Sequence, residues 1–83
     1  MRFALMERAL KAIGSMQEYY ESMLVKDWGD LPADVKVFLQ ECSMGHNEQA
    51  VKAAHVLAQH LDQGKLKPED VPLPVRKAIA QMI

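Results

Sequence analysis

The chain has 83 residues, of which 49% are apolar and 25% are charged, and its formal net charge is −1. This composition is typical of an ordinary globular domain and excludes disorder caused by low hydrophobicity and high net charge. Charges so nearly balanced give no general attraction to nucleic-acid phosphates or to anionic lipid.

The single cysteine and the N-terminal segment bear on where the protein is found. Cys42 has no second cysteine with which to form an intramolecular disulfide, so we expect a reducing compartment. Glu7, Arg8 and Lys11 interrupt the first apolar run before it reaches the roughly 7 residues that a secretory signal needs. No stretch approaches the roughly 18 apolar residues of a membrane span. We therefore predict a cytoplasmic protein that does not enter a membrane.

The first predicted element is a long helix over Phe3–Lys26, a range without proline. Its apolar residues recur at alternating steps of three and four, the period of a helix with one buried side, and the pattern continues without a break to Val25. A stripe rich in methionine can form an adaptable binding groove, but this spacing matches helix packing, and we interpret the stripe as core. Its residues are Met6, Ala9, Ile13, Met16, Tyr20 and Met23, flanked by Leu5, Leu10, Ala12, Tyr19 and Leu24.

A turn and a second helix follow. Gly29 suits the left-handed backbone that often follows a helix end, Asp30 can cap the next helix, and Pro32 fits its first turn. The second helix is therefore predicted over Pro32–Ser43. Its core-facing residues are Leu31, Val35, Phe38, Leu39 and Cys42.

Two more helices are predicted in the C-terminal half. Gly45 ends the second helix, and Asn47 can cap the third. The third helix is predicted over Glu48–Gln63, and a short fourth helix begins at Pro74 after a connector rich in proline. The residues expected to pin the connector to the core are Leu66, Val71 and Leu73, and those of the fourth buried stripe are Val75, Ala78, Ile79 and Met82.

The predicted fold class is all-α, with one small four-helix domain over residues 1–83. The connections are short, so antiparallel packing of neighbouring helices is the default. The first helix is long enough for the three shorter helices to pack along it. A chain of this length buries only about 60 to 65% of the surface that its unfolded form exposes, so we expect marginal stability.

No set of residues has the composition or spacing of a catalytic or metal centre. The soft ligands in the chain are Cys42, His46, His55 and His60. A structural zinc site needs four ligands, usually in close pairs, and the last two histidines lie about 140° apart around a helix. The acidic residues are scattered over predicted solvent faces, without a phosphate-binding loop or a nucleophile motif. We therefore expect no catalytic residue, no metal, no cofactor and no enzymatic activity.

The second and third predicted helices, joined around Gly45, have the outline of a helix-turn-helix. Glu41 and His46 stand where that motif normally has a small and an apolar residue. The third helix would present Lys52 beside Glu48 near its start, and affinity for DNA depends mainly on neutralising phosphates. A DNA-binding transcriptional regulator is therefore the alternative function, and nucleic acid is not the expected partner.

The most informative feature is a second apolar side on the second predicted helix. Val37 and Met44 are seven apart, with Ala33 in line, and they project away from the core-facing stripe. Apolar residues on this side must either be covered by another part of the chain or form an interface. Asp34 and Glu41 lie on the same side and would supply a charged rim.

These observations favour a helical protein-binding module that docks on another protein as an adaptor, inhibitor or regulatory subunit, or that pairs with itself as a homodimer. Val37 and Met44 are expected at the apolar centre of its docking surface. The full set of predicted partner-binding residues is Ala33, Asp34, Val37, Glu41 and Met44.

Overall fold

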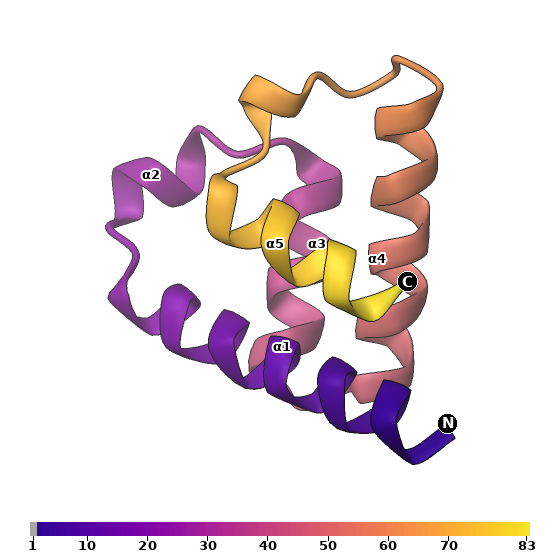
Figure 1. Ribbon diagram of the computed structural model, residues 1–83. Helices are drawn as coiled ribbons and strands as arrows, with labels where there is room; N and C mark the ends of the chain where they lie inside the picture. Colours follow the sequence, from indigo (N-terminus) through magenta and orange to yellow (C-terminus); the bar gives the residue numbers. More distant parts are fainter. Residues whose placement is uncertain (1) are drawn as a thin grey trace.

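Five α-helices and one short 3-10 turn make up the computed structural model, which describes the backbone of residues 2–83 and the side chains of residues 6–83. No strand occurs within residues 2–83. α1 runs along one side of the molecule, and α3, α4 and α5 pack against it (Figure 1). The predicted fold class, a long first helix packed against three shorter helices, is confirmed. The elements are α1 (Arg2–Ser22), α2 (Val25–Gly29), α3 (Ala33–Ser43), α4 (Asn47–Asp62), the turn η1 (Pro68–Asp70) and α5 (Leu73–Met82).

The N-terminal helix is shorter than predicted. α1 ends at Ser22, and the extended residue Leu24 (φ −76°, ψ 151°) separates it from the short helix α2. The rings of Tyr20 and Trp28 meet edge to face, with centroids 5.3 Å apart and 84° between the ring planes. In one straight helix, residues this far apart in sequence would be separated by about 12 Å along the axis, so the bend is needed for this contact. The prediction of one unbroken helix to Lys26 is therefore wrong.

The chain leaves α3 and α4 through glycines in the left-handed conformation. Gly45 and Gly64 both have a φ of 74°, and each follows the end of its helix, as the sequence predicts for Gly45. The sequence predicts the same conformation for Gly29, which is instead the last residue of α2 and has no positive φ. That prediction is wrong because the chain continues from α2 through Asp30 in right-handed helical backbone, which requires no glycine.

The N-terminal ends of α3 and α4 lack the predicted side-chain caps. Pro32, not Asp30, holds the N-cap position of α3, with φ −58° and ψ 150°. His46, not Asn47, holds the N-cap position of α4. Neither helix end has a hydrogen bond from the cap side chain. At α3 the fixed φ of Pro32 sets the direction in which the chain enters the helix. The carboxylate of Asp30 is therefore not needed as a cap.

The core lies where α1, α3, α4 and α5 meet. Phe38 of α3 is completely buried there and is among the largest such side chains, together with Met16 of α1 and Leu57 of α4. The side-chain amide of Gln17 donates a 2.9 Å hydrogen bond to the carbonyl oxygen of Cys42, which joins α1 to the end of α3. The other buried residues among residues 6–83 are Ala12, Ile13, Val35, Leu39, Cys42, Ala50, Ala54, Val71, Val75, Ala78, Ile79 and Met82. Leu73, predicted to pin the connector, is exposed instead.

Gly14 lies within α1, where no packing contact requires a glycine. A Cβ atom added there would meet no atom within 4 Å. We expect Gly14→Ala to raise the free energy of unfolding by about 0.5–1 kcal/mol, because alanine has the higher helix propensity. Urea unfolding would measure the change. Gly45→Ala is the matched control, and it should destabilise the protein because its φ of 74° strains any residue with a Cβ. A destabilising Gly14→Ala would contradict this account of α1.

Candidate functional site

The second apolar side of α3 lies at the protein surface. Val37 is 50% exposed and Met44 is 56% exposed, whereas Val35, two residues before Val37, is completely buried. About half of the surface of each of these two residues is therefore accessible to solvent. We call the following residues the α3 edge: Ala33, Asp34, Val37, Glu41 and Met44.

Both acidic residues of the α3 edge are joined to histidines. Asp34 Oδ2 lies 2.8 Å from Nδ1 of His60, near the end of α4. Glu41 Oε2 lies 2.9 Å from Nδ1 of His46, in the turn between α3 and α4. An ionised carboxylate only accepts hydrogen bonds, so in both pairs the Nδ1–H group of the imidazole is the donor. These contacts place both carboxylates along the line where α3 meets α4.

The two carboxylate–histidine pairs orient side chains more than they stabilise the fold. The side chains of Asp34 and His46 are about half exposed, and those of Glu41 and His60 are partly exposed. Pairs this accessible to water typically contribute about 0–1 kcal/mol. Their effect is to fix the direction of each carboxylate at the rim of the α3 edge.

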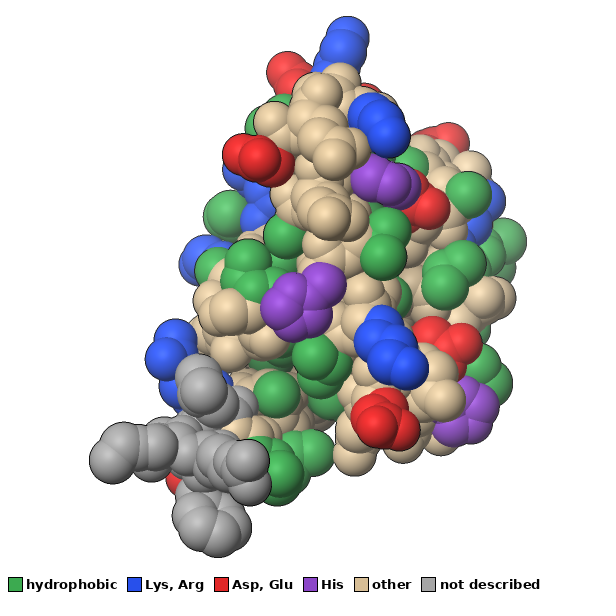
Figure 2. All heavy atoms as spheres, turned by 90° about the vertical axis from the view of Figure 1, so that its right-hand side faces the viewer, with side chains coloured by type: hydrophobic (Ala, Val, Ile, Leu, Met, Phe, Trp, Pro, Cys, Tyr) green, Lys and Arg blue, Asp and Glu red, His purple; other side chains and the backbone are tan. Residues whose placement is uncertain are grey.

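These two pairs were not predicted from the sequence, in which the histidines were considered as candidate metal ligands and His46 also as part of a possible helix-turn-helix. The Glu41–His46 contact spans the turn at Gly45, so its short separation could have suggested it. The Asp34–His60 contact joins the start of α3 to the end of α4, 26 residues apart in sequence, so its prediction requires knowledge of how the two helices pack. Figure 2 looks onto the α4 side of the molecule, where histidine, acidic and hydrophobic side chains are interspersed over the surface.

A third exposed apolar side chain extends the α3 edge onto α4. The Asp34–His60 contact brings the start of α3 to the end of α4, so the helices run in opposite directions. Moving one turn along each helix from this contact reaches Val37 on α3 and Val56 on α4, both of them exposed. The apolar centre of the surface is therefore shared by two helices.

A separate hollow lies between the N-terminal halves of α1 and α4. It has a volume of about 500 Å³, and its apolar walls include Met6 and Leu10, which are 60% and 48% exposed. Both residues belong to the α1 stripe that the sequence analysis assigned to the core, so that interpretation is wrong for them. The helices that pack on α1 leave the side chains of Met6 and Leu10 largely uncovered. The residues of this α1/α4 groove are Met6, Ala9, Leu10, Ile13, Asn47, Glu48, Val51 and Lys52.

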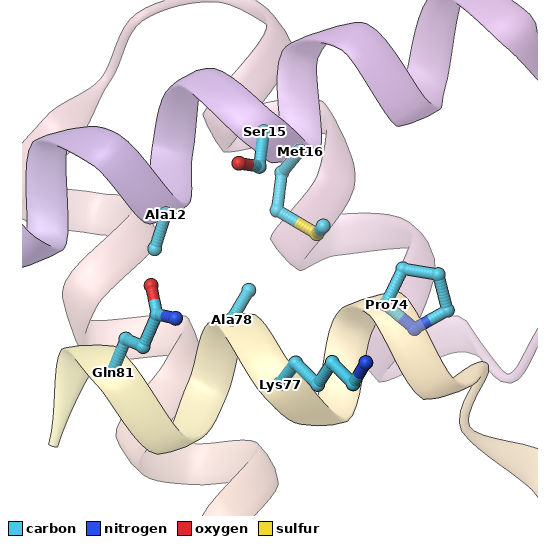
Figure 3. A pocket seen from close by; sticks show the side chains of 7 residues that line it. All are labelled: Ala12, Ser15, Met16, Pro74, Lys77, Ala78 and Gln81. Atoms are coloured by element: carbon cyan, nitrogen blue, oxygen red, sulfur yellow. The ribbon is translucent and has the colours of Figure 1, made fainter.

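A smaller crevice lies between α1 and α5, and its described side chains do not form a catalytic site. Its volume is about 240 Å³. Figure 3 shows Ser15 and Met16 projecting from α1, opposite Lys77 and Gln81 on α5. Among the described side chains, Lys77 is the one charged residue that lines it. A lone amine without an adjacent acid or base is not a catalytic constellation.

Cys42 lies in the core rather than at a site. Its side chain is completely buried, as the position of this residue on the core-facing stripe predicts. Burial, with a smaller contribution from the negative charge of Glu41, raises the pKa of the Cys42 thiol to about 12. A thiol in this state is protonated at neutral pH and is a poor nucleophile. Among the residues that the structure describes, no group of three or more histidine, cysteine, aspartate or glutamate residues could hold a metal ion.

Within residues 2–83 no helix combines the length and the apolar character needed to cross a membrane. Comparison of the chain with models of protein families, with curated proteins and with solved structures finds no match.

Proposed function

We propose that this protein is a non-enzymatic, cytoplasmic protein-binding module that docks on a partner through the α3 edge, as an adaptor, inhibitor or regulatory subunit. The observation that carries this proposal is the exposure of Val37 on α3 and of Met44 directly after it, on the side of α3 opposite its buried residues. A contiguous apolar surface bordered by charges is typical of protein interfaces.

The rim of the α3 edge indicates which side chains a partner would offer. Asp34 and Glu41 each use one carboxylate oxygen to accept a hydrogen bond from a histidine. The other oxygen of each has no hydrogen-bond donor among the side chains of residues 6–83. A lysine or arginine of the partner could bind either free oxygen while apolar side chains cover Val37 and Met44.

Affinity capture with matched variants tests this proposal. Tagged parent protein should retain a specific partner from a native lysate, and Val37→Asp should lose at least about 90% of it, because the charge would be desolvated at the centre of the contact. Val25→Asp introduces the same change at an exposed valine outside the α3 edge and should retain the partner. Equal retention by both variants would contradict the assignment of the α3 edge.

A helix-turn-helix regulator is the second candidate, because α3 and α4 are joined by a turn of three residues, Met44–His46. The exposed side chains at the start of α4 include Glu48 and Lys52, whose charges cancel. Such a surface neutralises few phosphates. Salt-dependent retention on DNA that is lost in Lys52→Glu would favour this second function, whereas no retention at low salt would exclude it.

A further inference from the structure

The break between α1 and α2 lacks the residues that normally end one helix and begin the next. No glycine or proline lies within residues 15–28, and no basic residue lies in the last turn of α1. Leu24 holds the N-cap position of α2 and its side chain makes no capping hydrogen bond. Only Met23 and Leu24 separate the two helices. The local sequence therefore does not enforce the bend.

The bend also leaves backbone donors unpaired. Within residues 2–83, the N–H groups of Leu24 and Val25 donate to no backbone carbonyl. In a continuous helix these donors would bond to the carbonyl oxygens of Tyr20 and Glu21, four residues earlier. Straightening the chain at this point therefore forms helical hydrogen bonds and breaks none.

Little buried surface holds α2 in its bent position. No residue of α2 is buried, and Figure 1 shows the corner between α1 and α2 at the edge of the molecule. Leu24 and Val25 are 65% and 88% exposed, the highest values among the large apolar side chains of residues 6–83. The main attachment of α2 is Trp28, which packs on Tyr20 and is partly buried against the core.

A straight helix cannot keep α1 on the core of its own chain. Ala12, Ile13 and Met16 of α1 are buried in the core, to which α3, α4 and α5 also contribute. If α1 continued along the axis of α2, these side chains would leave that core and expose its apolar interior. A second copy opened in the same way offers the identical surface, so each α1 can take the place that the other has left. The matching occupant of an opened copy is therefore a second copy.

We propose that this chain has a second state, a dimer in which two copies exchange α1 and in which α1 and α2 of each copy form one straight helix over residues 2–29. α1 of each copy packs on α3, α4 and α5 of the other, as it does within one chain. The two straight helices cross near Leu24 and Val25, whose exposed side chains cover each other there. α3 and α4 stay together, so the dimer carries two α3 edges.

Refolding at high and low concentration tests whether the exchange occurs. The exchange requires α1 to leave the core, so the dimer should form when the protein is refolded from urea at about 1 mM and should be rare at about 10 µM. Size-exclusion chromatography would separate the two species. The isolated dimer should return to monomer after it is unfolded and refolded at about 1 µM.

A cross-link between α1 and α5 distinguishes the exchanged dimer from any other dimer. Ser15 of α1 and Lys77 of α5 line the two sides of one crevice (Figure 3), and both are exposed. In the variant Ser15→Cys/Lys77→Cys, a bismaleimide should link the two thiols within one chain in the monomer and between chains in the isolated dimer. Denaturing electrophoresis of the dimer should then show two linked chains. A dimer that runs as single chains would not have exchanged α1 and would overturn the proposal.

Val25→Pro should block the exchange while leaving the monomer folded. Val25 is the first residue of α2, a position that favours proline, and Leu24 before it has the extended backbone (ψ 151°) that a following proline requires. In a straight helix, proline at this position would clash with the carbonyl group of Glu21. We expect thermal unfolding at or above the temperature of the parent, and a dimer yield lowered at least about tenfold.

Val25→Ala is the matched control, because it removes the same exposed side chain and permits the straight helix. It should form the dimer in a yield within about threefold of the parent, since the exchanged contacts of α1 are unchanged. A folded Val25→Pro protein that dimerises as well as Val25→Ala would overturn the proposal. So would a parent protein that stays monomeric after refolding at about 1 mM.

Discussion

Val35→Asp should abolish folding, whereas Val37→Asp should leave the fold nearly unchanged. Val35 is completely buried, on the same side of α3 as Phe38 and Cys42. No buried polar or charged residue lies among residues 6–83 to pair with a carboxylate there. An unpaired charge in a core costs several kcal/mol, which is comparable to the whole stability of a domain this small. We therefore expect Val35→Asp to lose most helical circular dichroism at 25 °C.

Val37→Asp makes the same chemical change two residues away, on the exposed side of α3. Its side chain can remain hydrated, so the free energy of unfolding should change by about 0.5 kcal/mol or less. Thermal and urea unfolding of both variants would measure the difference. If Val37→Asp melted far below the parent, Val37 would be covered in the folded protein, and the α3 edge could not be a docking surface.

Cys42 should react with a thiol reagent about a thousandfold more slowly in the folded protein than in denaturant. Its pKa of about 12 reduces the thiolate fraction at pH 8 by roughly this factor relative to an ordinary cysteine, and complete burial restricts access further. Labelling with iodoacetamide, followed by mass spectrometry, would give both rates. Equal rates in the two conditions would mean that Cys42 is accessible in the folded protein and that its side of α3 does not face the core.

The same thiol should make the protein less stable in alkali. Because the folded pKa is raised, the unfolded chain loses the Cys42 proton first, near pH 9, while the folded chain keeps it up to about pH 12. The contribution of the protonated Cys42 thiol to the free energy of unfolding is therefore complete below pH 9. Between about pH 9 and pH 12 this contribution falls by about 1.4 kcal/mol per pH unit. Burial, with a smaller contribution from the negative charge of Asp27, also raises the pKa of Tyr19. Ionisation of this tyrosine therefore lowers the stability of the folded protein in alkali as well. Cys42→Ala should reduce the slope measured by urea unfolding between pH 9 and 11.

The parts of the fold that could be predicted from the sequence are those with a local cause. Gly45 and Gly64 end helices because only glycine adopts their backbone conformation without strain. The stripe of α3 predicts the burial of Val35, Phe38 and Cys42, because residues at this spacing share one side of a helix. For Val37 and Met44 the sequence left two alternatives, burial by another part of the chain or exposure at the surface. The packing of the other helices, which the sequence pattern does not reveal, decides between them.

The features that were missed depend on contacts between distant residues. The break after Ser22 has no glycine or proline to mark it, and it accompanies the packing of Trp28 on Tyr20. Met6 continues the same periodic stripe as Ile13, yet only Ile13 is covered, because periodicity does not reveal where the neighbouring helices end. The α1/α4 groove therefore became visible only in three dimensions.

The edge-to-face contact of Trp28 with Tyr20 gives the molecule a built-in optical reporter. Trp28 is the sole tryptophan of the chain, and it belongs to α2, a helix in which no residue is buried. Segments with so little buried surface open at lower free energy than the core around Phe38. Tryptophan emission from this protein therefore follows the corner between α1 and α2, and its transition can precede the loss of helical structure.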